Sequence, residues 1–273
     1  MSGLDAGAIQ RRLSVETIAR LDDLEAFSSI ASTNTHLLAQ PPPAPGRFRV
    51  AIADHQTSGR GRHDRRWFSP PGSGLYLSLS YTFAAMPAQL PGLTLALGVG
   101  IITALARLGI DGVSLKWPND IVARDGKLGG ILTEVQSGSG DTVTVVTGIG
   151  LNINLPERVD FGSESGWAHR PVDLNTIVDK PPGRELLAGS IIESLYAIFV
   201  QFEALGFNEF VDAWRRHDWL MDREITVDLP DTQITGVAAG VDEDGALLLD
   251  RPTGRTRIVS GSILMTGTEE PPR

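Results

Sequence analysis

The sequence contains no cysteine, and this absence excludes several kinds of chemistry. A chain without thiols forms no disulfide bond, no thiolate zinc site and no thiol nucleophile. The five histidines are scattered, without the short spacings typical of a dedicated metal site. No serine, histidine and aspartate ordering or carboxylate pair points to covalent catalysis either. We therefore expect no dedicated metal site and no covalent enzyme intermediate.

Long apolar runs and net positive charge are also lacking. No segment approaches the ~18 apolar residues of a membrane span, and residues 1–24 have no apolar core typical of a secretion signal. The formal net charge of −9 argues against general affinity for nucleic acid or anionic membranes. We expect a cytoplasmic protein with neither nucleic acid nor membrane as a partner.

The chain has 273 residues, enough for one large domain and a small one. Residues 1–220 alternate helical and strand patterns, which predicts an α+β fold with a mixed β-sheet flanked by helices. Residues 221–273 change to short strands with tight turns, which predicts a small β-barrel. The main predicted helices are 8–20, 32–40, 93–108, 185–205 and 207–217, and the main predicted strands are 49–53, 75–81, 113–116, 131–135 and 142–149, with a turn at 138–140.

Four arginines lie in a nine-residue run that contains two glycines and ends in a tryptophan, Gly59-Arg60-Gly61-Arg62-His63-Asp64-Arg65-Arg66-Trp67. Glycines allow close backbone approach, and guanidinium groups bind carboxylate or phosphate in pairs of hydrogen bonds. The run therefore predicts an anion-binding loop. It lacks the third glycine of a dinucleotide fingerprint, because Asp64 occupies that position. A nucleic-acid patch and a solvated charged face remain alternatives.

Three further segments place polar residues at predicted strand ends, where binding sites commonly lie. They are Lys116-Trp117-Pro118-Asn119-Asp120, Lys127-Leu128-Gly129-Gly130-Ile131 and Gly148-Ile149-Gly150-Leu151-Asn152. Taken singly, the first is ordinary turn chemistry and Lys127 is an ordinary solvated lysine. Taken together with the arginines, they supply positioned cations without a nucleophile, which suits phosphoryl or adenylyl transfer. No P-loop motif is present.

In order and spacing, these segments resemble the signatures of the biotin protein ligase family. Ser32-Thr33-Asn34 and Gln56 agree as well, and the resemblance runs from about Ala26 to Met265. It implies a catalytic domain of the class II aminoacyl-tRNA synthetase and biotin ligase type, followed by an SH3-like barrel. It also implies a two-step reaction. Biotin and MgATP give biotinyl-5′-AMP, and a lysine of the biotin carboxyl carrier domain of an acyl-CoA carboxylase then takes the biotinyl group.

The resemblance also implies roles for individual residues. Asp120 would orient or deprotonate the acceptor lysine, and we expect the arginine loop to be mobile until ligands bind. The catalytic residues would be Arg60, Lys127 and Asp120. Biotin would contact Ser32, Thr33, Asn34, Gln56, Gly59, Arg60, Arg62 and Lys127. The nucleotide would contact Arg62, Arg65, Trp67, Asn119, Lys127 and Asn152, with Mg²⁺ arriving on ATP.

Several points stay open on the sequence alone. A lipoate ligase or octanoyl transferase would share the fold, although the motifs fit biotin better, and a nucleic-acid-binding module is a more distant alternative. Only about 25 residues precede the predicted catalytic sheet, too few for the DNA-binding domain of some relatives, so we expect no operator binding. Either a monomer or a homodimer is compatible with the sequence. Residues 41–46 and 156–182 have no assigned role.

Overall fold

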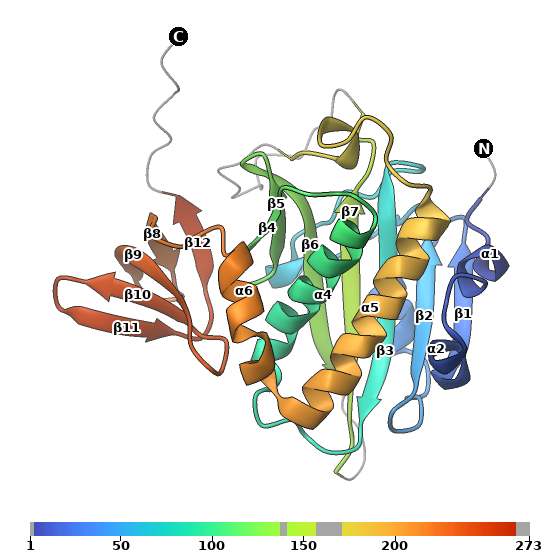
Figure 1. Ribbon diagram of the computed structural model, residues 1–273, viewed down its shortest axis with the longest axis horizontal. Helices are drawn as coiled ribbons and strands as arrows, with labels where there is room; N and C mark the ends of the chain where they lie inside the picture. Colours follow the sequence, from blue (N-terminus) through green and yellow to red (C-terminus); the bar gives the residue numbers. More distant parts are fainter. Residues whose placement is uncertain (1–2, 137–140, 157–170, 266–273) are drawn as a thin grey trace.

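The computed structural model describes residues 3–136, 141–156 and 171–265, and its largest element is a seven-stranded mixed sheet (Figure 1). The strand order is β1-β2-β3-β7-β6-β5-β4. β1 and β2 are parallel, and the remaining neighbours are antiparallel. The strands are β1 (Leu21–Phe27), β2 (Phe48–Ala53), β3 (Gly74–Phe83), β4 (Val113–Lys116), β5 (Asp120–Ala123), β6 (Gly126–Gln136) and β7 (Val143–Asn152). The predicted mixed sheet is confirmed.

Helices cover both faces of this sheet, so the strand β3 is buried along its whole length. Alternate side chains of β3 point to opposite faces. Tyr81 stacks on Phe199 of α5, whereas Ser78 meets residues of α3. One face therefore carries α4 (Leu93–Arg107) and α5 (Arg184–Leu205), and the other carries α3 (Thr33–Leu38). The remaining α-helices are α1 (Ala6–Gln10), α2 (Val15–Arg20) and α6 (Val211–His217).

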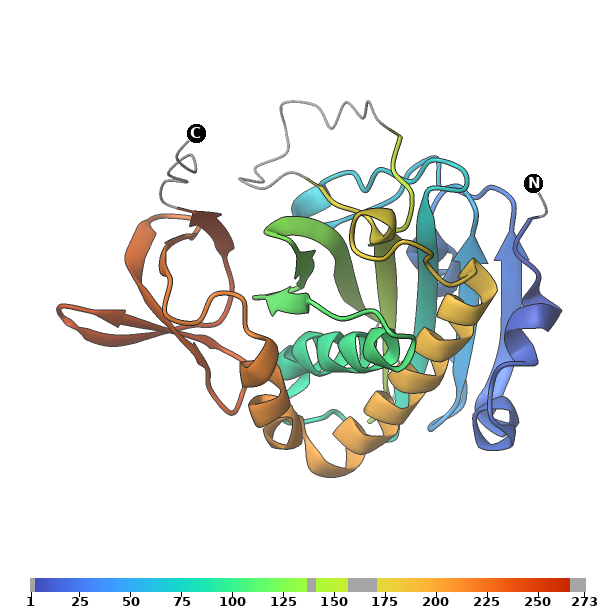
Figure 2. The same ribbon diagram turned by 45° about the horizontal axis from the view of Figure 1, so that its top comes forward.

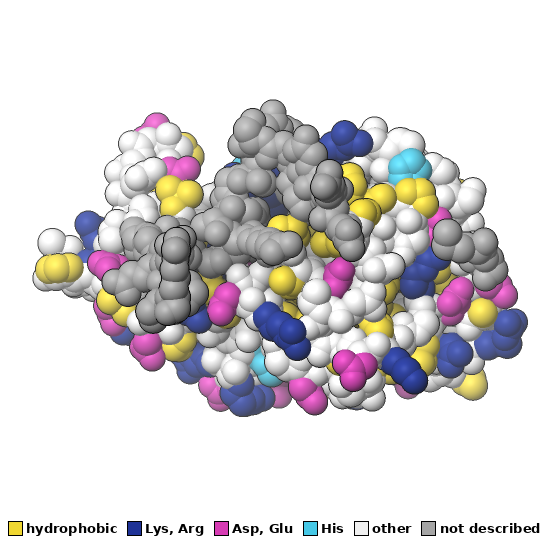
Figure 3. Space-filling model, turned by 90° about the horizontal axis from the view of Figure 1, so that it is seen from above, with side chains coloured by type: hydrophobic (Ala, Val, Ile, Leu, Met, Phe, Trp, Pro, Cys, Tyr) yellow, Lys and Arg dark blue, Asp and Glu magenta, His cyan; other side chains and the backbone are white. Residues whose placement is uncertain are grey.

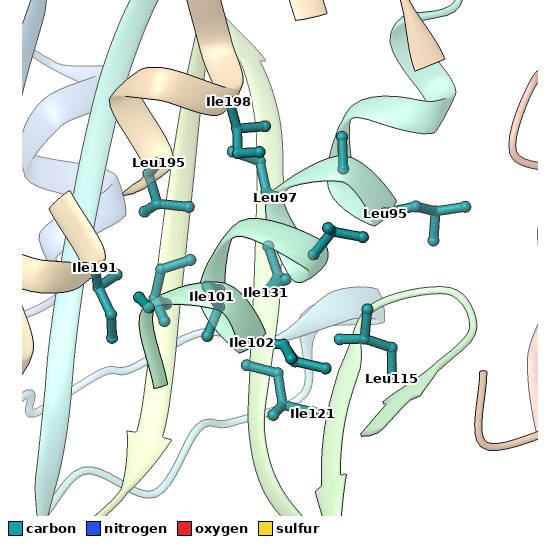
Figure 4. Packing of buried hydrophobic residues seen from close by; sticks show 14 of the residues in the cluster. Leu95, Leu97, Ile101, Ile102, Leu115, Ile121, Ile131, Ile191, Leu195 and Ile198 are labelled. Carbon is teal, nitrogen blue, oxygen red and sulfur yellow. The ribbon is translucent and has the colours of Figure 1, made fainter. Parts of the chain in front are cut away.

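The helices α4 and α5 pack closely because α4 has glycine at the contact. A side chain at Gly100 would meet Ile198 of α5 at 2.7 Å, so only glycine allows this approach. Ser194 of α5 donates a hydrogen bond to the Gly100 carbonyl over 2.7 Å. Leu97, Ile101, Ile191 and other apolar side chains fill the space between these helices and the sheet (Figure 4).

Within the described residues, two segments meet the length and composition criteria for a membrane span, contrary to the expectation that none would approach them. They are Leu90–Arg107 and Arg184–Leu205, and 67% and 61% of their apolar windows are buried inside the structure. These segments contain α4 and α5, whose apolar residues form the core between the two helices and the sheet. Core helices of this kind pass the same test by length and composition alone.

The C-terminal part forms a second, five-stranded antiparallel sheet with the order β11-β10-β9-β8-β12. Its strands are β8 (Glu224–Asp228), β9 (Gln233–Val241), β10 (Leu247–Arg251), β11 (Gly254–Ile258) and β12 (Ser262–Met265). This sheet lies on the β4 side of the main sheet, and the N-terminal helices lie at the β1 side (Figures 1 and 2). The predicted small β-domain is confirmed, although no ladder between β11 and β12 closes a barrel in the residues described. The boundary at residue 221 stays a prediction.

Other differences from the expected elements are local. The predicted helix 8–20 is two helices, because Ser14 interrupts it and caps α2 by accepting a hydrogen bond from the Thr17 amide. Asp120 begins the strand β5, which is too short to give a periodic signal. The predicted turn at 138–140 and most of the segment 156–182 lie outside the described residues.

Charged side chains are mixed over the visible surface. On the face seen in Figure 3, lysine and arginine lie among aspartate and glutamate, and the visible described residues form no single continuous basic patch. This distribution gives no support on that face to the alternative of a nucleic-acid-binding module.

Candidate active site

A cavity of about 440 Å³ lies between α3, the arginine loop, the strands β6 and β7, and the C-terminal sheet. Its lining is unusually cationic for an acidic protein. Two carboxylates, Asp120 and Asp228, face it. The cationic side chains that line it are those of Arg60, Arg62, Arg65, Arg66, Lys116 and Lys127. Such an excess of positive charge in a concave site favours anionic ligands.

The arginine loop is a small hairpin rather than an irregular excursion. The Trp67 amide donates to the Gly59 carbonyl over 2.8 Å, and the Gly61 amide donates to the Arg65 carbonyl over 2.7 Å. A side chain at Gly59 would lie 2.6 Å from the Trp67 carbonyl oxygen, which explains the glycine. Gly59 is not among the cavity-lining residues, so its contribution in this structure is to the hairpin.

Polar groups at the start of α3 form one corner of the cavity. Ser32 caps this helix by accepting a hydrogen bond from the Thr35 amide over 3.4 Å. The amide and hydroxyl of Thr33 donate to Gln56 Oε1 over 2.8 and 3.1 Å. Gln56 Nε2 in turn donates to Ser69 Oγ over 3.2 Å. Thr33, Gln56 and Ser69 are therefore a connected set of buried hydrogen-bonding groups, whose orientation is fixed before a ligand arrives.

Asn34 and Ser78 complete this corner. Asn34 Nδ2 donates to the Leu132 carbonyl and to Glu134 Oε2, and Asn34 Oδ1 accepts from Ser78 Oγ over 2.6 Å. A side chain at Gly148 would lie 2.3 Å from Asn34 Oδ1, so a glycine is needed there. Ser78 was not predicted as a site residue from the sequence. The available signal was a small polar residue within an otherwise buried strand.

An ion pair joins two of the predicted catalytic residues. Lys127 Nζ lies 2.6 Å from Asp120 Oδ1, and the two side chains are 19% and 12% exposed. The same ammonium lies 5.2 Å from the centroid of the Trp67 ring. The Trp67 ring packs directly against Gly150, because a Cβ at this glycine would lie only 2.3 Å from the ring. The arginine loop, β5, β6 and β7 therefore meet at this point.

Lys116 is a further site residue that the sequence analysis did not assign. It pairs directly with Asp120 in the β4–β5 register and is only 4% exposed. Burial lowers the pKa of its ammonium, and the negative charge of Asp120 opposes this shift. Its ammonium also lies 5.7 Å from the centroid of the Trp219 ring. Its place in the strand register was not readable from sequence.

Arg62 links the catalytic sheet with the C-terminal sheet. Its Nη1 donates to Asn119 Oδ1 over 3.3 Å and lies 3.5 Å from the Gly261 carbonyl oxygen. Asn119 Nδ2 donates to the Ile131 carbonyl over 2.9 Å. Burial lowers the pKa of the Arg62 guanidinium, whereas Asp120 acts in the opposite direction. A second connection joins Trp117 Nε1 to the Gly245 carbonyl over 3.1 Å.

Asn152 lies outside the cavity lining, unlike the other residues predicted to contact the nucleotide. Its Nδ2 donates to the carbonyls of Lys127 and Val172 over 3.2 and 3.0 Å. In this structure Asn152 therefore holds the backbone of Lys127, and its contact with a nucleotide stays a prediction. No cluster of three or more histidine, aspartate or glutamate side chains suited to a metal ion occurs in the described part of the chain.

Comparison with known proteins places these motifs in a family. Residues 26–152 match the model of the biotin/lipoate A/B protein ligase family, and residues 221–265 match that of the biotin protein ligase C-terminal domain. A biotin–[acetyl-CoA-carboxylase] ligase of Mycobacterium tuberculosis is 34% identical over 244 residues, which cover 87% of this chain and 86% of that protein. The chain belongs to the biotin protein ligase family. The resemblance inferred from the motifs is confirmed.

Further relatives agree with this family. The bifunctional ligase/repressor BirA of Salmonella typhimurium is 34% identical over 251 residues, covering 91% of this chain and 74% of that protein. Among solved structures, the biotin protein ligase of Aquifex aeolicus in complex with biotin and ATP is 28% identical with a TM-score of 0.71. That match covers 89% of this chain and 97% of the other. The biotin ligase fold therefore extends through both sheets.

Proposed function

We propose that this protein activates biotin with MgATP to biotinyl-5′-AMP and then transfers the biotinyl group to a lysine of a biotin carboxyl carrier domain. The proposal rests on one observation, which is that a single cavity contains both a polar corner and a group of cations. A polar corner of Ser32 and the hydrogen-bonded pair Thr33 and Gln56 is suited to an uncharged ureido ring. The cations of the arginine loop, with Lys127, suit two anions that must approach each other.

In the first step, a biotin carboxylate oxygen attacks the α-phosphorus of ATP, and pyrophosphate leaves with the electron pair of the broken bond. Two negative groups repel each other before this bond forms, and Arg60, Arg62 and Lys127 would offset that repulsion. Lys127 is paired with Asp120 over 2.6 Å. We infer that it exchanges part of this pairing for the reacting anions when they bind.

In the second step, the acceptor amine attacks the carbonyl carbon of the mixed anhydride, and AMP leaves. The amine must lose a proton to form a stable amide. Asp120, relieved of part of its pairing with Lys127, would accept this proton or hold the amine in position. This assignment gives Lys127 its main role in the first step and Asp120 its main role in the second.

The nucleotide would lie against Trp67, with Arg65 and Asn119 beside it, because these residues line the cavity next to Lys127. Magnesium would arrive bound to ATP. With six cations and two carboxylates in the lining, phosphate oxygens are better ligands for it than protein side chains. Bound magnesium would neutralise charge on the departing pyrophosphate.

An ATP-consuming protein modification of this kind is expected in the cytoplasm. The acceptor would be a carrier domain of an acyl-CoA carboxylase, in line with the relatives named biotin–[acetyl-CoA-carboxylase] ligase. Monomer and homodimer both remain compatible with the proposal, and DNA binding is not part of it.

The decisive experiment is ATP–pyrophosphate exchange by the purified protein, with biotin, with lipoate and with neither. The proposal predicts exchange that depends on biotin. Exchange with lipoate in place of biotin would assign the chain to the other branch of its family. No exchange by folded protein in the presence of magnesium would contradict the proposed adenylation.

A further inference from the structure

Glu134 of β6 is a carboxylate whose two oxygens bind different parts of the site. Its Oε1 accepts a hydrogen bond from Arg60 Nη2 over 2.6 Å, and its Oε2 accepts one from Asn34 Nδ2 over 2.8 Å. Its side chain is 22% exposed, so water screens these contacts only partly. One residue therefore contacts both the arginine loop and the polar corner.

The contact with Asn34 determines which way the amide points. An ionised carboxylate only accepts hydrogen bonds, so the amide nitrogen of Asn34 must face Glu134. The Leu132 carbonyl, also only an acceptor, lies 3.2 Å from the same nitrogen. The amide oxygen is thereby directed to Ser78 Oγ, 2.6 Å away. Glu134 thus helps to set the pattern of donors and acceptors in the polar corner.

The contact with Arg60 holds the loop to the rest of the site. Arg60 and Arg66 form an antiparallel bridge inside the hairpin. A contact that holds Arg60 in place therefore also restrains the opposite side of the loop. Arg60 Nη1 also lies 3.4 Å from Thr35 Oγ1 of α3, a weaker contact. Glu134 is therefore the principal anchor for this guanidinium among the described residues.

We propose that Glu134 is a positioning residue that couples the polar corner to the arginine loop, orienting Asn34 with one oxygen and holding Arg60 beside the cavity with the other. The coupling rests on the proposed function, because it gives the polar corner to biotin and the loop to the anions. An acidic anchor keeps the loop near the cavity without ligand.

The experiment compares Glu134→Gln, Glu134→Ala and the wild type. A glutamine has one acceptor oxygen, and the buried Asn34 amide needs it more than the exposed Arg60, which water can solvate. Glu134→Gln should leave the biotin Kd within about threefold by calorimetry. It should raise the rate of tryptic cleavage at residues 60–66 of the ligand-free protein roughly threefold to tenfold, and it should speed adenylate release from the enzyme without acceptor.

Glu134→Ala should show the same loop effects and, in addition, weaken biotin binding by roughly tenfold or more. The matched control is Glu193→Gln. Glu193 also accepts hydrogen bonds through both oxygens, from Ser14 and Thr17, but it lies on α5 outside the cavity. This control should alter none of the three readouts. Thermal unfolding of each variant separates loss of coupling from loss of the fold.

Unchanged loop cleavage and adenylate release in Glu134→Gln would overturn the proposal, as would biotin binding by Glu134→Ala that equals the control. If Glu134→Gln lost biotin binding as strongly as it lost resistance to cleavage in the loop, the separate roles of the two oxygens, one for Asn34 and one for Arg60, would also be contradicted. The cleavage assay contains no ligand, so its outcome does not depend on the proposed function. If wild-type protein showed no biotin-dependent exchange, only the proposed function would fail on that result.

Discussion

Asp120 is surrounded by cations from three elements. Lys127 of β6 contacts it directly, and Lys116 of β4 and Arg62 of the arginine loop interact with it electrostatically. These cations would repel an acceptor amine that enters as an ammonium. Asp120 would therefore have to hold the amine by a direct contact that replaces part of its pairing with Lys127.

Replacing Asp120 by asparagine tests this role. Asp120→Asn removes the charge that holds Lys127 but leaves Lys127 available for the first step, so biotin-dependent pyrophosphate exchange should stay within a few-fold of wild type. Transfer from preformed adenylate to a carrier domain should slow on the order of 10²-fold, because general-base assistance contributes about that much. Single-turnover assays measure the two steps separately. Equal losses in both would instead indicate a role for Asp120 at the nucleotide or its metal.

Gly150 provides a second test at the scale of one residue. An alanine there would place its Cβ 2.3 Å from the Trp67 ring, and overpacking of this kind costs about 1–3 kcal/mol. Gly150→Ala should therefore displace Trp67 and raise the KM for ATP roughly tenfold, with a smaller effect on the biotin Kd. Gly183→Ala, where the nearest side-chain atom is 4.0 Å away, is the control. An unchanged KM for ATP would remove Trp67 from the nucleotide site.

At the scale of elements, the arginine loop combines order and exposure. Its hairpin hydrogen bonds are short, yet Arg60, Arg65 and Arg66 are exposed side chains at a cavity rim. Like charges in a short loop repel one another, and bound anions relieve that repulsion. The loop should therefore be held more firmly when the cavity is filled.

Limited proteolysis tests this expectation. Biotin with ATP should slow tryptic cleavage at residues 60–66 by roughly tenfold, because each charge-assisted hydrogen bond to a ligand contributes ~1.5–3 kcal/mol. Cleavage at an unrelated exposed site such as Arg11, whose side chain is 72% exposed, serves as the internal reference. Equal cleavage rates with and without ligands would show that the loop does not close on them.

The arginine loop and the lysine motifs were predictable because their unusual composition lies within short stretches of sequence. Ser78, Lys116 and Glu134 were not assigned, because each depends on strand register, which decides the face and the neighbours of a side chain. The short strand β5 was not predicted for a related reason, because four residues are too few to show a strand periodicity. Asn152 belonged to a matching motif, but the side chain contacts backbone outside the cavity.

At the scale of the whole molecule, the junction between the two sheets contains a buried carboxylate that is only partly hydrogen-bonded. Asp218 follows α6, and burial raises the pKa of its side chain from 3.8 to about 6. Its Oδ1 accepts from the Leu220 amide over 2.9 Å, whereas Oδ2 is buried without a hydrogen-bond partner among the described residues. The indole of Trp214 opposes the rise in pKa without reaching hydrogen-bond geometry.

This raised pKa predicts a specific pH dependence. The folded protein holds a proton on Asp218 that the unfolded chain releases, so the contribution of Asp218 to stability falls as pH rises from about 4 to 6. Asp218→Asn should then be more stable than wild type at pH 7, by about 1–2 kcal/mol, with the difference vanishing below about pH 4. Urea unfolding at several pH values measures it. Asp212→Asn, an exposed change on the same helix, should show no such trend.

The bond between Trp117 and Gly245 has a consequence for genetics. The indole that precedes Asn119 and Asp120 takes its hydrogen-bond acceptor from the turn between β9 and β10, 128 residues further along the chain. Gly245 has a positive φ and no room for a side chain, since a Cβ would lie 2.9 Å from Gly92. Mutations in that turn should therefore cause the same biotin-dependent growth defect as mutations in residues 116–120. Second-site suppressors of mutations in one of these two segments should arise in the other segment.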